Sequence, residues 1–139
     1  MSLVRILVVD DFVPWRNLVR QQLCLLTDMR FVGEAGDGLE AVVKAEKLQP
    51  DLILLDIRLP TFNGIEAARQ ISRLVPRAKI VFLSSIADFD VVRAAFNAGG
   101  HGYVLKWDAG AALIPGIEAV LRGERFVSCG LSGFTQSQE

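Results

Sequence analysis

The sequence predicts an α/β domain in which a doubly wound parallel sheet is covered by helices on both faces. Strand-like apolar runs alternate five times with helical patterns, which is typical of strand–helix–strand units. Carboxylates end two of the apolar runs, where folds of this class place their ligand-binding groups. The predicted strands are residues 4–9, 31–35, 51–56, 79–84 and 102–105, and the predicted helices are residues 14–27, 38–48, 64–75, 88–98 and 109–122.

Proline and glycine mark the boundaries of these elements. Pro14 suits the first turn of the first helix, because its missing N–H would have no helical partner there. Pro50 ends the second helix, because the residue before a proline is pushed out of the α region. Pro115 falls inside the fifth helix, where it removes a hydrogen bond to Ala111 and costs about 3 kcal/mol. The other boundaries are marked by Asp37-Gly38, Gly64, Pro76, Gly99-Gly100 and Gly123.

Length and composition fit one domain with a sizeable core. The 139 residues are 51% hydrophobic and carry a formal net charge of -1, so nucleic acid and anionic membranes are not expected partners of this segment. We expect no membrane span and no signal peptide, and a cytoplasmic location. The single histidine, His101, makes a histidine-based zinc site improbable and is interpreted as a surface loop residue. Residues 1–125 are expected to form the domain and residues 126–139 a tail or linker that frays from Ser128 onward.

Three carboxylates are predicted to meet at one edge of the sheet. Asp10 and Asp11 follow one buried strand, and Asp56 follows another. Like charges raise each other's pKa, so a hard dication with oxygen ligands would stabilise the group, and Mg²⁺ is the expected ion. Lys106 and Ser84 end two later strands and complete a site suited to a phosphoryl group.

These residues belong to longer motifs, each at a strand end, that together resemble a known family. The motifs are Leu7-Val8-Val9-Asp10-Asp11, Asp56-Ile57-Arg58-Leu59-Pro60-Thr61-Phe62-Asn63-Gly64, Phe82-Leu83-Ser84-Ser85 and Gly102-Tyr103-Val104-Leu105-Lys106. The chain resembles, over residues 4–125, the receiver domain of two-component response regulators. The stretches 98–103 and 117–125 are most similar to the NarL/LuxR-type subgroup. This resemblance implies a flavodoxin-like fold with strand order 2-1-3-4-5 and a ligand site between the first and third strands.

The resemblance also implies a role for each site residue. Asp56 would accept the phosphoryl group, and Mg²⁺ would be held by Asp10, Asp11, Asp56 and the backbone carbonyl of Arg58. Lys106 would pair with Asp56 or with its phosphoryl oxygens.

Four side chains would sense or modulate the phosphoryl group. Ser84 would donate a hydrogen bond to it, and Tyr103 would move inward as the switch aromatic. The Arg58 side chain and Ile86 are expected to shield the phosphorus and lengthen the life of the acyl phosphate.

The implied function is a signalling switch that assists its own phosphorylation and slow dephosphorylation without being an enzyme. A sensor histidine kinase would donate the phosphoryl group, and the surface of the fourth helix, fifth strand and fifth helix would report it. The expected output is a phosphorylation-dependent homodimer that controls transcription, with DNA bound only through a domain absent from this chain.

Three alternatives remain at this point. A phosphohydrolase with an aspartyl phosphate would need a second acid two residues after Asp56, where Arg58 stands, and a substrate cap. A flavodoxin-like cofactor binder would need a loop rich in Ser, Thr and Gly in place of residues 10–14. A stand-alone or degenerate receiver acting as an interaction module is kept open by Pro115 and by Trp107, which stands where many receivers have proline.

Overall fold

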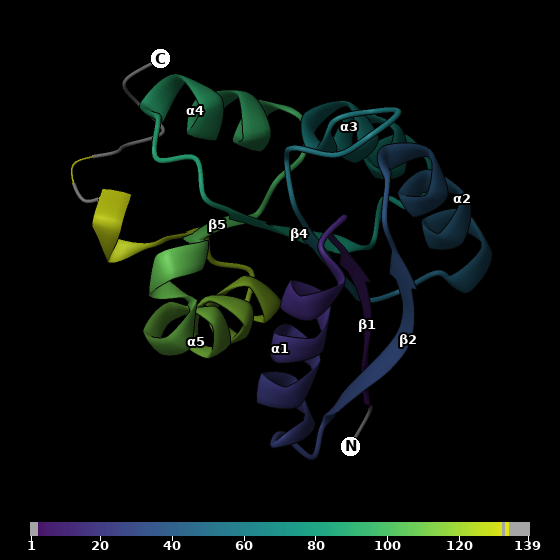
Figure 1. Cartoon of the computed structure of the whole chain (residues 1–139), viewed down its shortest axis with the longest axis horizontal. Helices are drawn as coiled ribbons and strands as arrows, with labels where there is room; N and C mark the ends of the chain where they lie inside the picture. The colour runs from purple at the N-terminus through teal and green to yellow at the C-terminus, as the bar shows by residue number, and fades with distance from the viewer. Residues whose placement is uncertain (1–2, 132, 134–139) are drawn as a thin grey trace.

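The buried apolar runs of the sequence form a parallel sheet, which the computed structural model describes over residues 3–131 and 133 (Figure 1). The order of its strands is β2-β1-β3-β4-β5-β6, so the direction of winding reverses between β1 and β3. The strands are β1 (Val4–Val9), β2 (Met29–Ala35), β3 (Leu52–Leu55), β4 (Lys79–Ser84), β5 (Gly102–Leu105) and β6 (Phe126–Val127).

Helices cover both faces of the sheet, as the alternation of strand and helix patterns predicts. The helices are α1 (Val13–Cys24), α2 (Gly38–Leu48), α3 (Gly64–Leu74), α4 (Phe89–Asn97) and α5 (Ala109–Leu121), with short 3-10 turns η1 (Lys106–Asp108) and η2 (Cys129–Leu131). Figure 1 shows α1 and α5 on one side and α2, α3 and α4 on the other. Asp37, Asn63 and Asp88 cap α2, α3 and α4 by accepting backbone N–H bonds. Among the described helices, none combines the length and apolar character needed to cross a bilayer.

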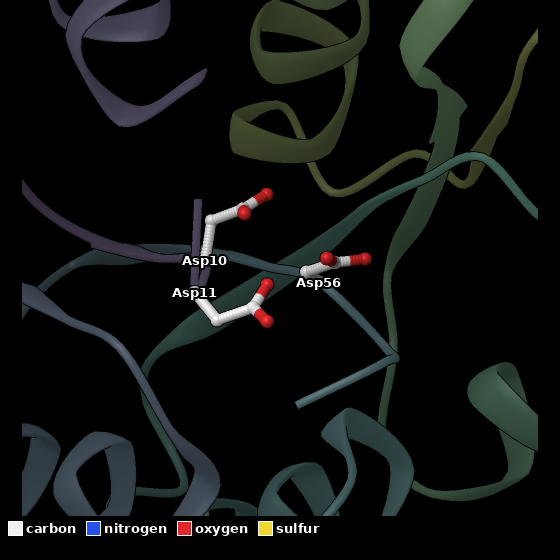
Figure 2. A group of neighbouring side chains, drawn as sticks. All are labelled: Asp10, Asp11 and Asp56. Atoms are coloured by element: carbon white, nitrogen blue, oxygen red, sulfur yellow. The ribbon is translucent and has the colours of Figure 1, made fainter. Parts of the chain in front are cut away.

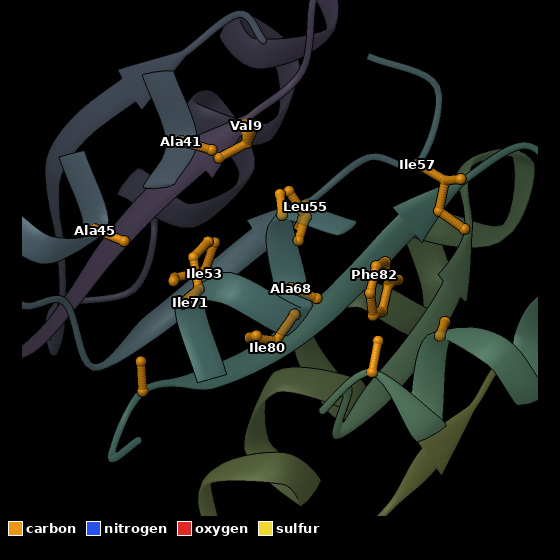
Figure 3. Close-up of a cluster of buried hydrophobic side chains, with 14 of the residues drawn as sticks. Val9, Ala41, Ala45, Ile53, Leu55, Ile57, Ala68, Ile71, Ile80 and Phe82 are labelled. Carbon is orange, nitrogen blue, oxygen red and sulfur yellow. The ribbon is translucent and has the colours of Figure 1, made fainter. Parts of the chain in front are cut away.

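Two hydrophobic cores lie on opposite faces of the sheet, because successive strand residues point in opposite directions. Ile6 and Val8 of β1 pack in the core formed with α1 and α5. Leu7 and Val9 pack in the core formed with α2, α3 and α4 (Figure 3). On that face the helices contribute several small residues, which let the helix backbones approach the sheet closely: Ala41, Ala45, Ala67, Ala68 and Ala95.

The prediction of five strands is wrong, because β6 adds a sixth parallel strand beside β5. The Ser128 hydroxyl accepts a hydrogen bond from the Leu105 N–H at 2.8 Å, which satisfies a buried donor of β5 beyond the two residues paired with β6. Ser128 and Leu131 are both buried, so the predicted fraying is wrong for residues 128–131. The rest of the predicted tail, residue 132 and residues 134–139, lies outside the described residues. The domain boundary at residue 125 stays a prediction.

Two unusual sequence features are accommodated without a break in the fold. Helix α5 continues through Pro115, as the sequence pattern predicts. All peptide bonds between described residues are trans, including that between Lys106 and Trp107.

His101 lies in a bend, as the sequence indicates, but its side chain is half-buried rather than on the surface. It precedes β5, and its ring Nδ1 accepts a hydrogen bond from the Ile80 N–H at 3.1 Å, while the backbone N–H of His101 donates to the Ile80 carbonyl at 2.8 Å. The imidazole is half-buried, and burial lowers the pKa of His101, with the positive charges of Lys79 and Arg125 adding to the effect. The ring is therefore held in its neutral form, because protonation of Nδ1 would remove the acceptor of the Ile80 N–H.

This arrangement predicts a loss of stability in mild acid. The folded-state pKa of His101 lies below the unfolded value of about 6.5, so its contribution is complete above that pH and falls as pH drops through it. Between about pH 7.5 and about pH 5.5, the wild type should lose more unfolding free energy than His101→Gln, which does not titrate. Urea unfolding at the two pH values measures the difference. An equal pH dependence in both proteins would show that this hydrogen bond survives protonation.

Candidate functional site

The three predicted carboxylates lie together at the carboxyl ends of β1 and β3. These strands are neighbours, with Val9 opposite Leu55, and the Asp56 N–H donates to the Val9 carbonyl at 3.0 Å. Asp10, Asp11 and Asp56 each offer a carboxylate oxygen, and these oxygens all lie within 4.8 Å of one another (Figure 2). The reversal of winding between β1 and β3 thus brings the acids into one group.

Asp56 is, with Asp10, one of the two buried acids of this group. It is 7% exposed, and its Oδ1 accepts a hydrogen bond from the Ile57 N–H at 2.8 Å. Burial raises the pKa of Asp56, and the Lys106 charge only partly offsets that rise. Gly64 packs directly on this loop, since a Cβ there would lie 2.0 Å from the Asp56 carbonyl oxygen. The position of Asp56 therefore requires glycine at the start of α3.

Lys106 places its ammonium between two carboxylates. Its Nζ lies 2.6 Å from Asp10 Oδ2 and 3.3 Å from Asp56 Oδ2, and the side chain is 21% exposed. Burial by itself would lower the pKa of Lys106, but the hydrogen bond to Asp10 and the charges of Asp56 and Asp10 together raise it. The lysine is therefore a permanent cation here, and its shorter contact is to Asp10 rather than to Asp56.

The two adjacent acids Asp10 and Asp11 have different environments. Asp10 is 2% exposed, with Oδ1 accepting from the Phe12 N–H at 2.9 Å and Oδ2 paired with Lys106. Asp11 is exposed, and no described residue hydrogen-bonds to its carboxylate or forms an ion pair with it. Its oxygens are available for a ligand, whereas those of Asp10 are already engaged.

The donor set fits a hard divalent cation such as Mg²⁺. Carboxylates and carbonyls are the ligands that this ion prefers, and three carboxylate oxygens converge here. The predicted further ligand, the Arg58 carbonyl, accepts no hydrogen bond from the described part of the chain. Of the three acids, Asp11 and Asp56 are the better suited to hold the ion, because Asp10 is paired with Lys106, and a role for the Arg58 carbonyl stays a prediction.

The loop that follows Asp56 is tied to the start of α2. The Gly38 N–H donates to the Pro60 carbonyl at 3.0 Å, and the Leu39 N–H donates to Thr61 Oγ1 at 2.9 Å. Thr61 Oγ1 also lies 3.1 Å from Asp37 Oδ1. The loop that carries the Arg58 carbonyl is thereby fixed to the scaffold, while the Arg58 side chain itself is exposed.

Ser84 and Tyr103 are joined through the backbone of Ile86. The buried Ser84 hydroxyl accepts a hydrogen bond from the Ile86 N–H at 3.1 Å, and the Tyr103 hydroxyl donates to the Ile86 carbonyl at 2.8 Å. Tyr103 is 0% exposed and packs beside Phe82, so it already occupies an inward position. The sequence suggested Ile86 as an apolar wall, and its backbone link between the two predicted switch residues was not foreseen.

One further contact was missed by the sequence analysis. The Trp15 ring centroid lies 5.2 Å from Lys106 Nζ. The available signal was the position of Trp15 four residues after Asp11, in the first turn of the helix that leaves the acid pair. That position indicates proximity to the site but does not indicate which group the ring meets.

Comparison with known proteins agrees with this site. Residues 6–117 match the family described as the response regulator receiver domain. The chain is 38% identical over 121 residues to YxjL of Bacillus subtilis, an uncharacterized transcriptional regulatory protein, and 34% identical over 121 residues to the response regulator protein VraR of Staphylococcus aureus. These matches cover 87% of this chain, but only 56% of YxjL and 58% of VraR.

The fold also matches that of a solved LuxR-family protein. The crystal structure of a two-component response regulator from Aurantimonas sp. SI85-9A1 superposes with a TM-score of 0.91 at 32% identity, covering 99% of this chain and 97% of that one. The receiver-domain match spans most of the sequence, and both kinds of comparison point to the same subgroup. The chain belongs to the response regulator receiver domains, and within them to the NarL/LuxR type.

Proposed function

We propose that Asp56 accepts a phosphoryl group from a sensor histidine kinase in a Mg²⁺-dependent step. The observation that carries this proposal is the position of Asp56, buried beside Lys106 and within 4.8 Å of two further carboxylates. A carboxylate oxygen of Asp56 attacks phosphorus, a P–O bond forms, and the bond from phosphorus to the donor's imidazole nitrogen breaks. The electron pair of that bond leaves with the imidazole.

The charges around Asp56 match this transfer. Bound Mg²⁺ supplies neutralisation of the phosphoryl oxygens and offsets the repulsion of the acids. Lys106 has N–H donors that reach Asp56 Oδ2 at 3.3 Å and shift to a phosphoryl oxygen when one is attached there. Gly64 and the tied loop hold the nucleophile in place, so little reorganisation is needed.

The response to phosphorylation runs through the Ile86 link. The Ser84 hydroxyl accepts the Ile86 N–H and lies within hydrogen-bond reach of the Tyr103 hydroxyl, and its O–H can turn to donate to a phosphoryl oxygen. A shift of Ser84 toward the phosphoryl group moves Ile86, whose carbonyl holds the Tyr103 hydroxyl. The surface of α4, β5 and α5 therefore has two arrangements that the phosphoryl group biases.

The proposed output is a homodimer that controls transcription. This chain spans little more than half the length of YxjL and VraR, so DNA binding is assigned to a segment outside it. The net charge of -1 gives the receiver segment no electrostatic attraction of its own for DNA.

The test is intact-mass measurement after incubation with acetyl phosphate. With Mg²⁺ present, the protein should gain the mass of one phosphoryl group, and a chelator should prevent the gain. An unchanged mass with Mg²⁺, or full labelling without a divalent ion, would contradict the proposal.

Arg58 is predicted to lengthen the life of the acyl phosphate. Its exposed side chain begins two residues after Asp56 and is long enough to cover the approach of water to phosphorus. Arg58→Ala should release phosphate about twofold to fivefold faster than wild type, on the scale of a modest contact in the transition state. The decay of phosphorylated protein after removal of acetyl phosphate measures this, with Arg73→Ala on α3 as the control. Slower decay in Arg58→Ala would contradict the prediction and would show that the guanidinium speeds hydrolysis by stabilising its transition state.

A further inference from the structure

The ammonium of Lys106 rests against an aromatic ring as well as against carboxylates. The Trp15 centroid lies 5.2 Å from Nζ, which is within the range of a cation–π contact. Trp15 is the third residue of α1, and Lys106 follows β5 directly. The contact therefore joins the helix that leaves Asp11 to the strand end that carries the lysine.

The Trp15 ring lies beside a groove through which the Lys106 side chain is open to solvent. A groove of about 460 Å³ lies between α1 and the start of α5, and both Trp15 and Lys106 line it. The Lys106 side chain keeps 21% exposure, although Asp10 and Asp56 hold its ammonium at 2.6 and 3.3 Å. A long flexible side chain at such an opening points into solvent part of the time unless a neighbouring group stabilises its inward conformation.

Packing alone does not explain an indole at position 15. The Trp15 Nε1 is buried, and no group in the described part of the chain accepts its hydrogen bond. An unpaired buried N–H lowers stability, so an aliphatic side chain would serve the core beneath α1 at least as well. The property that an aliphatic side chain lacks is the electron-rich face, and a cation lies near that face.

We propose that Trp15 is a positioning residue that keeps the Lys106 ammonium at Asp10 and Asp56, ready to meet the phosphoryl group. A third carboxylate would also hold the ammonium, but it would occupy one of its N–H donors and add repulsion to the acid group. The ring attracts the cation without taking a donor, so the donors stay available when the charge on Asp56 changes. This inference rests on the proposed function, because it assigns Trp15 to the same phosphoryl transfer.

The kinetic test compares two substitutions at position 15. Trp15→Leu should slow labelling by acetyl phosphate at fixed Mg²⁺ about threefold, and Trp15→Phe, which keeps a ring face, should recover most of the rate. In a Lys106→Met background, Trp15→Leu should have no further effect, because its action passes through the lysine. Leu18→Ala, on the same helix and groove, is the matched control.

A fluorescence measurement tests the contact without phosphorylation. The chain has two tryptophans, so in a Trp107→Phe background Trp15 is the sole indole emitter. Lys106→Met should then change the Trp15 emission intensity, and Lys47→Met on α2 should not. Equal labelling rates for Trp15→Leu and wild type, additive effects with Lys106→Met, or unchanged emission would each overturn the inference. Absence of labelling in the wild type would instead overturn the proposed function itself.

Discussion

Asp56→Asn should abolish labelling of the protein by acetyl phosphate, with a loss of more than about a thousandfold, the scale seen when other nucleophiles are replaced. The amide oxygen is a poor nucleophile toward phosphorus. We expect neither neighbouring acid to take over the role. Asp10 is held by Lys106 at 2.6 Å and by the Phe12 N–H, and Asp11 is exposed at the rim. The measurement is intact mass after incubation with acetyl phosphate and Mg²⁺.

The same substitution should not unfold the protein. Burial raises the folded-state pKa of Asp56 above its unfolded value, so at neutral pH the ionised carboxylate lowers stability. Asparagine removes that charge and keeps an oxygen for the Ile57 N–H. The melting temperature without Mg²⁺ should therefore equal or exceed that of wild type, which separates loss of the nucleophile from loss of the fold. Asp28→Asn, in the connection between α1 and β2, should label normally. Full labelling of Asp56→Asn at another residue would refute the assignment.

Much of the fold follows from patterns that are local in the sequence. Buried parallel strands are nearly continuous apolar runs, so β1 and β3 are visible directly, and helical periodicity with turn residues marks the helices between strands. The sixth strand could not be found in this way. Phe126 and Val127 are only two residues, and their place is determined by a distant partner, the edge of β5. The hydrogen bond from Leu105 to Ser128 spans 23 positions, and no local pattern encodes it.

The candidate site was predictable in its membership but not in its internal pairing. Parallel strands end at one edge of a sheet, so Asp10, Asp11 and Asp56, at the ends of the neighbouring strands β1 and β3, had to lie near one another once the strands were known, and the long side chain of Lys106 can reach them from β5. Which acid holds the lysine depends on side-chain rotamers and on fractions of an ångström, and the structure places Nζ nearer to Asp10. Similarly, the sequence does not indicate which group the hydroxyl of a strand tyrosine will contact; for Tyr103 it is the Ile86 carbonyl. The roles of these residues in phosphoryl transfer stay predictions.

Asp11→Asn should weaken Mg²⁺ binding at least about tenfold, since loss of groups that only support a metal ligand already costs that much. Asp11 is the acid of the group whose oxygens have no partner among the described residues, so it offers full charge to an ion without breaking another contact. Titration calorimetry of the wild type and of Asp11→Asn measures the difference. Glu46→Gln, an exposed carboxylate on α2, should bind as the wild type does and serves as the control. Equal Mg²⁺ affinity in Asp11→Asn and wild type would show that Asp11 does not bind the ion.

The difference in melting temperature between Asp11→Asn and wild type should change sign when Mg²⁺ is added. Without a divalent ion, Asp11→Asn removes one of three negative charges whose oxygens lie within 4.8 Å, so the variant should melt at a higher temperature than wild type. With saturating Mg²⁺ the wild type should gain more stability than Asp11→Asn, because a tenfold difference in Mg²⁺ affinity corresponds to about 1.4 kcal/mol of binding-linked stability. A purely structural role for Asp11 would shift both curves in the same direction, and only a ligand role makes the order of stability depend on the ion. If neither protein responds to Mg²⁺ in calorimetry or in unfolding, the metal proposal is wrong, and Lys106 and the N–H groups of Phe12 and Ile57 stabilise the acids without an ion.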